Sequence, residues 1–206
     1  KNIDFYNFDE TELNLELQKT SDDTYLKTYK LKSSIINETS SLTSSLGISA
    51  YREDLKVDMN FKIFEDLSKK DSNRYEFIYP SYNLTKYFKN NNFSFNSTGS
   101  IKNYDTNVYE TVVINDFIYN SDSFFSNNGL TNSYNLLIKN VNTDSKKSTR
   151  YKQNRDHKIM SIVEYNSSYP LIKKIKNRSN ILKPMISLKF SPNNSKDLNN
   201  ADRRID

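Results

Sequence analysis

Residues 55–63 read Leu-Lys-Val-Asp-Met-Asn-Phe-Lys-Ile, and apolar side chains alternate with polar ones without a break. Successive side chains of a β-strand point to opposite faces, whereas a helix would distribute the same residues around its circumference. The stretch therefore predicts a two-faced strand. Its apolar face holds Leu55, Val57, Met59, Phe61 and Ile63, and its polar face holds Lys56, Asp58, Asn60 and Lys62.

Similar patterns recur along most of the chain. They predict strands at 12–19, 25–31, 42–51, 55–63, 75–88, 93–103, 108–119, 130–141, 157–169 and 181–190. Turns or polar loops are expected at 21–24, 33–41, 52–54, 67–74, 89–92, 121–129 and 142–156, the last of them exposed and mobile. Pro80 cannot donate a ladder hydrogen bond, so it predicts a kink, bulge or edge within its strand.

Many of these strands have about 9–12 residues, which is the length of a transmembrane strand, while soluble strands more often have about 5–6. Short turns and longer polar loops alternate roughly along the sequence, as in outer-membrane barrels. No segment shows a sustained helical stripe. We therefore expect an all-β fold, an antiparallel up-and-down meander of about 10–11 long strands that forms an open segment of a large transmembrane β-barrel.

Composition excludes several classes of function. The net charge is +5, but lysines are scattered among acidic residues and Asn is about one residue in seven, a composition typical of AT-rich coding. We therefore expect no nucleic-acid surface. The absence of cysteine excludes disulfides, thiol nucleophiles and cysteine-based metal sites within these residues. No run of some eighteen apolar residues is present, so a transmembrane helix is excluded while membrane-spanning strands are not.

Residues capable of catalysis do not form a convincing site. His157 is the only histidine, and no partner lies at a telling spacing, so a solvated surface histidine is expected. The adjacent carboxylates at 22–23, 53–54 and 65–66 would point to opposite faces of a strand and would not converge on one substrate atom. Three isolated glycines form no phosphate-binding loop. We expect no enzyme activity, cofactor or metal.

Aromatic residues lie near many predicted strand ends. Membrane barrels place such rings at both interfaces, but Tyr and Phe also favour strands in general, and both explanations stay open. The positions are Tyr51, Tyr75, Phe88, Tyr104, Tyr119 and Tyr169.

Several short motifs, in order along nearly the whole chain, resemble the barrel of the lipopolysaccharide-assembly protein family LptD, also called organic solvent tolerance protein. They are Ser21-Asp22-Asp23-Thr24-Tyr25-Leu26, Tyr79-Pro80-Ser81-Tyr82-Asn83-Leu84, Asn103-Tyr104-Asp105-Thr106-Asn107, Asn115-Asp116, Leu137 to Asn142, Ser168-Tyr169-Pro170-Leu171, Leu182-Lys183-Pro184, Phe190-Ser191-Pro192 and Asp202-Arg203-Arg204-Ile205. The chain is poorer in glycine than many members and far shorter than the whole protein.

The resemblance implies that residues 1–206 are part of one barrel domain in the outer membrane of a Gram-negative bacterium. It implies that the periplasmic jelly-roll domain and the terminal gate strands lie outside this sequence. The implied function is delivery of lipopolysaccharide from the periplasm to the outer leaflet. The implied partners are the plug lipoprotein LptE, the periplasmic bridge protein LptA and outer-membrane lipid. The polar face of residues 55–63 would line the lumen, and the apolar face would contact lipid.

Two alternatives remain open. The strands could belong to another outer-membrane barrel, such as a porin or a receptor-type transporter. They could instead form a soluble secreted β-sandwich or adhesin that binds glycans or surfaces, with its apolar faces packed sheet to sheet.

Overall fold

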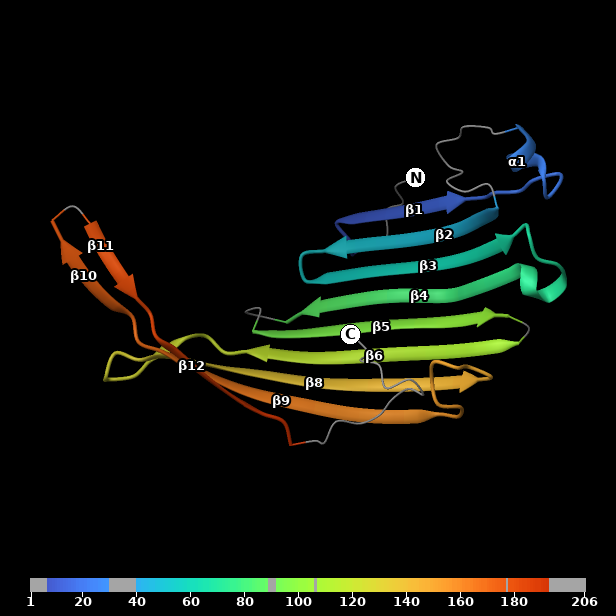
Figure 1. Cartoon of the computed structure of the whole chain (residues 1–206). Helices are drawn as coiled ribbons and strands as arrows, with labels where there is room; N and C mark the ends of the chain where they lie inside the picture. Colours follow the sequence, from blue (N-terminus) through green and yellow to red (C-terminus); the bar gives the residue numbers. More distant parts are fainter. Residues whose placement is uncertain (1–6, 30–39, 89–91, 106, 177, 193–206) are drawn as a thin grey trace.

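The computed structural model describes residues 7–29, 40–88, 92–105, 107–176 and 178–192. Within these residues one ten-stranded antiparallel sheet dominates, in the order β1-β2-β3-β4-β5-β6-β8-β9-β12, with the short β7 paired to β8 (Figure 1). Its strands are β1 (Glu10–Glu16), β2 (Ser41–Arg52), β3 (Leu55–Asp66), β4 (Tyr75–Tyr87), β5 (Phe93–Tyr104), β6 (Val108–Asn120), β7 (Phe124–Phe125), β8 (Thr131–Lys146), β9 (Asp156–Ser168) and β12 (Met185–Phe190). The expected all-β, up-and-down meander is confirmed.

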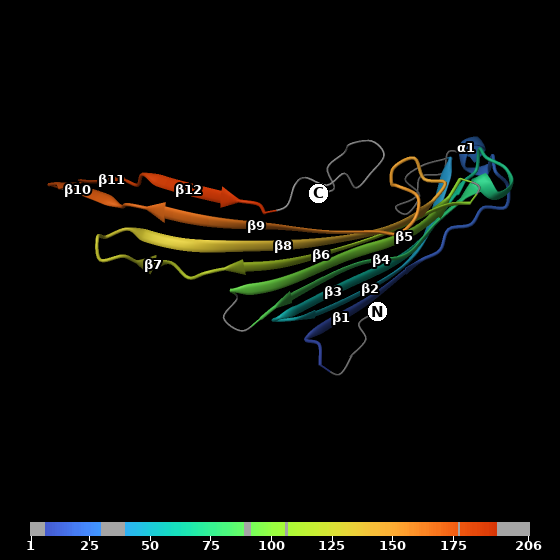
Figure 2. The ribbon, with the colours of Figure 1, turned by 90° about the horizontal axis from the view of Figure 1, so that it is seen from below.

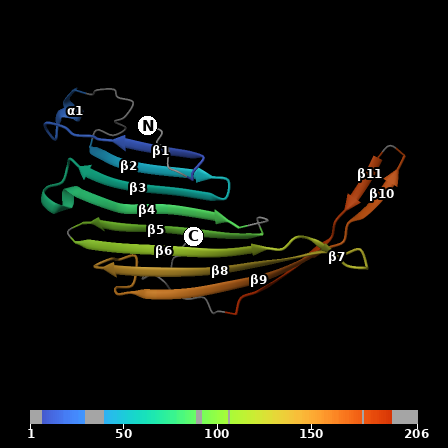
Figure 3. The ribbon, with the colours of Figure 1, turned by 180° about the vertical axis from the view of Figure 1, so that it is seen from behind.

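The sheet is open and strongly twisted. Figure 2 shows β8 and β9 running across the view while β1 to β4 run obliquely to them, as the right-handed twist of strands requires. Among the described strands, β1 and β12 each have one hydrogen-bonded neighbour in the main sheet, so the sheet ends in two edges and does not close into a barrel. A two-stranded hairpin, β10 (Leu171–Ile175) and β11 (Arg178–Leu182), projects beyond one end of the sheet (Figure 3).

The sequence predicted β2 to β6 with small errors at their ends. At Pro80, β4 contains a bulge, because the register with β5 shifts between Ile78 and Ser81. This confirms the prediction of a bulge at that proline. The predicted turn at 52–54 is also present, with Glu53-Asp54 joining β2 to β3.

The prediction of a strand at Tyr25–Leu31 was wrong in the described part, where residues Tyr25–Tyr29 form the helix α1. The Asp22 carboxylate accepts hydrogen bonds from the backbone N–H and hydroxyl of Thr24, and this local turn directs the chain into the helix. Leu26 is then buried against Leu42 and Leu67, the only buried apolar cluster among the described residues. The predicted loop at 33–41 lies mostly outside those residues.

Three further predictions need correction. The stretch 142–156 was expected to be exposed, but β8 continues to Lys146, and Thr143, Ser145 and Ser148 are buried. The single strand expected at 181–190 is divided between β11 and β12, and β10 was not predicted. Short and long connections also do not alternate between the two ends of the sheet, because 53–54 and 169–184 lie at one end and 105–107 and 147–155 at the other.

In the part of the chain that the structure describes, the apolar side chains do not gather in a central core. Among the described residues, no second sheet or helix covers the middle of either face (Figure 2). Phe117 is 45% exposed and Ile138 is 38% exposed, although each is paired with a neighbouring strand on both sides. The fold is therefore a single layer that leaves a large apolar surface uncovered.

Candidate functional site

The register of the sheet shows which side chains share a face, because directly paired residues of an antiparallel sheet point to the same side. The residues Leu55, Val57, Met59, Phe61 and Ile63 of β3 lie on one side, which we call the apolar face. Their paired neighbours include Leu46, Ile48, Tyr82 and Leu84. The residues Lys56, Asp58, Asn60 and Lys62 lie on the other side, the polar face, where their paired neighbours are mostly polar and include one apolar residue, Ile78. The assignment of these faces to lipid and lumen stays a prediction.

The apolar face has a height that suits a bilayer. On β6, Tyr109 and Tyr119 point to this face and are ten residues apart, which corresponds to about 34 Å along the strand. A strand tilted by about 35–45°, as in membrane barrels, would convert this length to a height of about 24–28 Å. The apolar band of such barrels is about 25 Å tall.

Aromatic rings gather near both ends of the apolar face. Near the hairpin end, ring centroids lie 4.5 Å apart for Phe93 and Tyr119, 5.7 Å for Phe95 and Phe117, and 5.1 Å for Tyr134 and Tyr165. Near the opposite end, Phe77 stacks on Tyr75 and Tyr79 at 6.1 and 5.4 Å. Leucine, isoleucine, valine and methionine predominate between the two groups on β2 and β3.

Two of the aromatic residues expected at membrane interfaces lie elsewhere. The register places Tyr51 and Tyr104 on the polar face. Tyr51 donates a hydrogen bond to Asp58 (3.0 Å), and Tyr104 donates one to Glu110 (2.9 Å). These two rings therefore do not belong to an aromatic belt on the apolar face, whereas Tyr75 and Tyr119 do.

The apolar residues of the apolar face form a band that crosses the sheet obliquely. The band is centred on Leu46 in β2, where it covers 42–50, and on Leu188 in β12, where it covers 186–190. We followed the position of Leu46 from strand to strand through the register, over the seven steps from β2 to β12. It arrives about ten residues away from Leu188. This is about 4.9 Å per step, close to the strand spacing of about 4.8 Å, so the band crosses the strands at about 45°.

The polar face carries charged groups that are more enclosed than the rings opposite. Lys139 lies 3.8 Å from Asp116, and Lys158 lies 2.9 Å from Asp156, with all four side chains about one quarter exposed. Asp116 Oδ1 is buried and has no hydrogen-bond partner in the described part of the chain. This face is not uniformly polar, since Val141 is fully buried on it. It is a mixed, mostly hydrophilic surface.

A chain of polar side chains crosses the apolar face. Ser97 donates to Asn115 (2.7 Å) and Asn115 donates to Asn140 (3.1 Å), so hydrogen bonds connect β5, β6 and β8. Tyr82 lies 3.2 Å from Ser97 at one end of this ladder. Asn142 donates to Asn140 (2.6 Å) near the other end. Sequence reasoning missed this ladder because its members come from separate strands whose register was unknown.

His157 completes the ladder on β9. Its Nδ1 lies 2.7 Å from Asn142 Oδ1, and the residue is exposed, as expected for a surface histidine. The amide partner was not foreseen.

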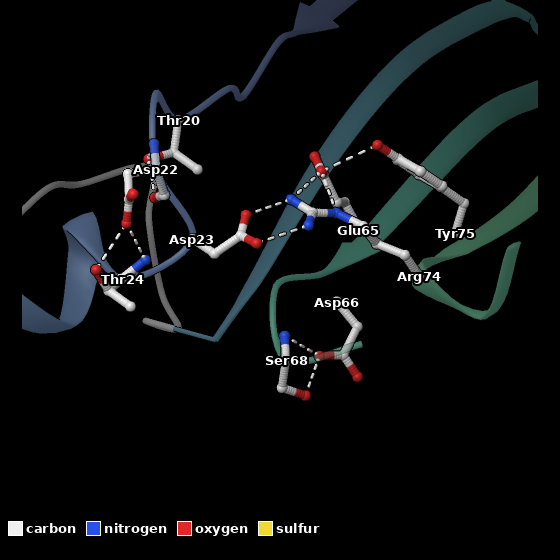
Figure 4. A network of polar contacts seen from close by, with 9 residues as sticks. All are labelled: Thr20, Asp22, Asp23, Thr24, Glu65, Asp66, Ser68, Arg74 and Tyr75. Carbon is white, nitrogen blue, oxygen red and sulfur yellow. Dashed lines mark hydrogen bonds and ion pairs between the residues drawn. The ribbon is translucent and has the colours of Figure 1, made fainter. Parts of the chain in front are cut away.

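Loops at the end of the sheet opposite the hairpin are joined by an ionic network (Figure 4). Arg74, in the short 3-10 helix η1 (Asp71–Arg74), contacts Asp23 through two nitrogens at 2.6 and 2.9 Å and donates to Glu65 at 2.7 Å. These carboxylates raise the pKa of Arg74, and Arg74 lowers the pKa of Asp23. The contacts tie the segment before α1 to the β3–β4 connection.

The paired carboxylates found in the sequence serve separate partners, as strand and turn geometry predicts. Glu65 binds Arg74, whereas Asp66 accepts a hydrogen bond from the Ser68 hydroxyl (2.6 Å). Asp54, in the β2–β3 turn, pairs with Arg52 (2.6 Å) and with Lys86.

A buried carboxylate on the polar face was missed by sequence reasoning. Glu110 is 2% exposed and accepts hydrogen bonds from Tyr104 and from Ser148 of the β8–β9 loop. A cavity of about 540 Å³ nearby is lined by Tyr104, Lys102, Arg74 and Arg150 among others. The cavity combines both signs of charge, and we assign no reaction to it. No sequence signal marked Glu110, because a single Glu within an apolar strand is common.

The positions that carry the family resemblance are spread over the fold. Asn103 and Tyr104 end β5, Asn107 precedes β6, Asn115 and Asp116 lie within β6, Pro170 and Pro184 flank the hairpin, and Pro192 follows β12. Thr106, Asp202 and Arg203 lie outside the described residues. The positions that the structure describes meet at no common site.

No protein-family model matches the chain, and no curated protein matches it significantly. Among the described residues, no group of three or more His, Cys, Asp or Glu side chains is arranged to hold a metal ion. No helix in the described ranges is long and apolar enough to cross a membrane.

Proposed function

We propose that this chain forms part of the wall of an outer-membrane β-barrel of the LptD type, which delivers lipopolysaccharide from the periplasm to the outer leaflet. The observation that carries the membrane assignment is the oblique apolar band. Closing a sheet into a membrane barrel requires strands tilted by about 35–45°, so a band level with the bilayer must cross them at that angle. The ordered family motifs support the assignment to LptD.

The two faces suit the transport of an amphiphile. The task is to move an anionic sugar head and its acyl chains across a boundary without exposing either part to the wrong solvent. The polar face would line a hydrated lumen for the head group, where Lys56 and Lys62 act as mobile point charges toward phosphate. The acyl chains would leave sideways into lipid. By resemblance, LptE would occupy the lumen and LptA would supply the substrate from the periplasm.

Cysteine labelling in the complete protein tests the orientation of the faces. This segment has no cysteine, so Phe61→Cys and Lys62→Cys each add one thiol on opposite faces of β3. Leu188→Cys and Lys189→Cys form a matched pair on β12. In liposomes, a water-soluble maleimide should label both lysine positions at least tenfold faster than their apolar neighbours. Equal rates, or faster labelling of the apolar positions, would reject the proposed orientation.

The cargo is tested separately. A benzoyl-phenylalanine placed at Lys62 should form a light-induced cross-link to lipopolysaccharide during transport. A porin would instead pass small solutes and give no such adduct. A soluble β-sandwich would fold in water without detergent, with its apolar face protected from lipid probes.

A further inference from the structure

The β10–β11 hairpin stands apart from the rest of the fold. It lies between β9 and β12 in sequence, but it extends past the end of the main sheet (Figures 1 and 3). Its five pairs run from Leu171–Leu182 at the base to Ile175–Arg178 near the tip. Every side chain of the hairpin whose burial is described is exposed.

The hairpin segment carries a charge equal to the whole chain's net charge. Residues 169–184 contain five basic residues and no acidic residue, so they contribute +5, while the remaining 25 basic and 25 acidic residues cancel. The basic residues are Lys173, Lys174, Lys176, Arg178 and Lys183. None of them has an acidic partner among the described residues. These cations are therefore available to an external anion.

The base of the hairpin is apolar. Leu171 pairs with Leu182 and Ile172 pairs with Ile181, and these four side chains are 44–68% exposed. The two pairs are consecutive, so they point to opposite faces of the hairpin and make its base apolar on both sides, at the end of the sheet toward which the apolar band shifts by β12. Four of the five cations lie beyond them, toward the tip. The hairpin thus passes from apolar to cationic along its length.

We infer that this hairpin binds the phosphate-bearing head groups of anionic lipids, with its Leu–Ile base in the interfacial layer and its cations among the phosphates. The inference rests on the membrane location in the proposed function, but not on lipopolysaccharide as cargo. Lysine heads on flexible stems suit a fluid layer of phosphates better than one fixed phosphate. Each basic residue near an anionic surface strengthens binding about fivefold.

The test uses the full chain in neutral maltoside micelles, with a polarity-sensitive dye on Ser179→Cys at the hairpin. Adding phosphatidylglycerol to the micelles should shift the dye emission, and phosphatidylcholine should not. Lys173→Gln with Lys174→Gln should weaken the phosphatidylglycerol response about 25-fold. The matched control, Lys19→Gln with Lys70→Gln, removes the same charge from two exposed positions outside the hairpin and should weaken the phosphatidylglycerol response less than twofold.

Each alternative outcome has a definite meaning. An equal loss in the control would attribute binding to net charge and overturn the inference. Full competition by inorganic phosphate at the same phosphate concentration would indicate a discrete anion site and would also overturn it. If the chain folds in water without micelles while the dye still responds to phosphatidylglycerol, the proposed wall function fails and the hairpin inference stands. If the chain needs micelles to fold but the dye does not respond, the hairpin inference fails and the proposed wall function stands.

Discussion

A lysine placed in the middle of the apolar face should be costly in a depth-dependent way. Met59 is the midpoint of the apolar side of β3, with Leu55 and Ile63 four residues away on either side. Four residues span about 13 Å along the strand. At a tilt of about 45°, Met59 lies about 9 Å deeper than either end. We therefore choose Met59→Lys as the most informative perturbation.

The expected cost follows from this depth. A lysine at the midplane on the lipid side of a membrane barrel costs about 2–4 kcal/mol, falling to about 0–1 kcal/mol near the interfaces. Met59→Lys should thus lower the free energy of unfolding by about 2–4 kcal/mol. Leu55→Lys should lower it by about 1 kcal/mol or less. Asn60→Lys, on the polar face beside Asp58 and Lys62, should change it by about 0.5 kcal/mol at most.

The assay is reversible guanidinium unfolding of the complete protein from lipid vesicles, with strand content followed by circular dichroism. Repeating it in vesicles with shorter acyl chains should reduce the Met59→Lys cost, because the charge then lies nearer to water. A cost independent of acyl-chain length would contradict contact with hydrocarbon. It would instead fit an apolar face packed against another sheet. Equal costs for Met59→Lys and Asn60→Lys would refute the assignment of these two residues to an apolar and a polar face.

Three further predictions concern stability, each measured by denaturant unfolding. Gly99→Ala should cost about 1–3 kcal/mol, because the new Cβ would lie 2.8 Å from Tyr82 Cζ. Gly47→Ala should change stability by no more than about 0.5 kcal/mol, because its tightest contact is the movable amide oxygen of Asn60 at 3.1 Å. Bonds from its two cationic neighbours lower the pKa of Asp54, so stability should fall as pH drops below about 4, and Asp54→Asn should flatten this slope. Glu110→Ala should cost about 1–3 kcal/mol, because the hydroxyl protons of Tyr104 and Ser148 would lose their acceptor; no loss would show that the carboxylate is not buried in solution.

Sequence periodicity predicted the strands wherever one face is apolar. In β3 the alternation from Leu55 to Ile63 could be placed directly, because slipping by one residue would reverse every side chain. It failed where both faces are polar, as in the last residues of β8, Asn142–Lys146, which are held in the sheet by pairing with β6. It also failed at Tyr25–Tyr29, where one buried leucine and a local Asp22 turn outweigh strand propensity.

The features of the candidate site that were missed all depend on register. The oblique band requires the relative positions of eight strands, and no single strand contains that information. Glu110 and Ser148 are 38 residues apart and meet only because the β8–β9 loop returns to β6. Sequence reasoning took the lysines to be scattered among acidic residues and so missed residues 169–184, which hold five basic residues and no acidic one. The separation of these cations from the acidic residues also depends on the projection of the hairpin from the sheet.

The polar ladder on the apolar face is the feature that most opposes contact with lipid, and its geometry reduces the conflict. Unsatisfied polar groups in hydrocarbon cost several kcal/mol each. The side chains of Ser97, Asn115 and Asn140 instead use one another as donors and acceptors, and Asn140 also donates to the Lys158 carbonyl (3.3 Å). The apolar band shifts toward the hairpin end from β5 to β9. The ladder therefore lies in the middle of the band on β5 and β6, but at the edge of the band on β9, where His157 is. A lysine at Asn115 would break the ladder, whereas a charge at His157 would face water.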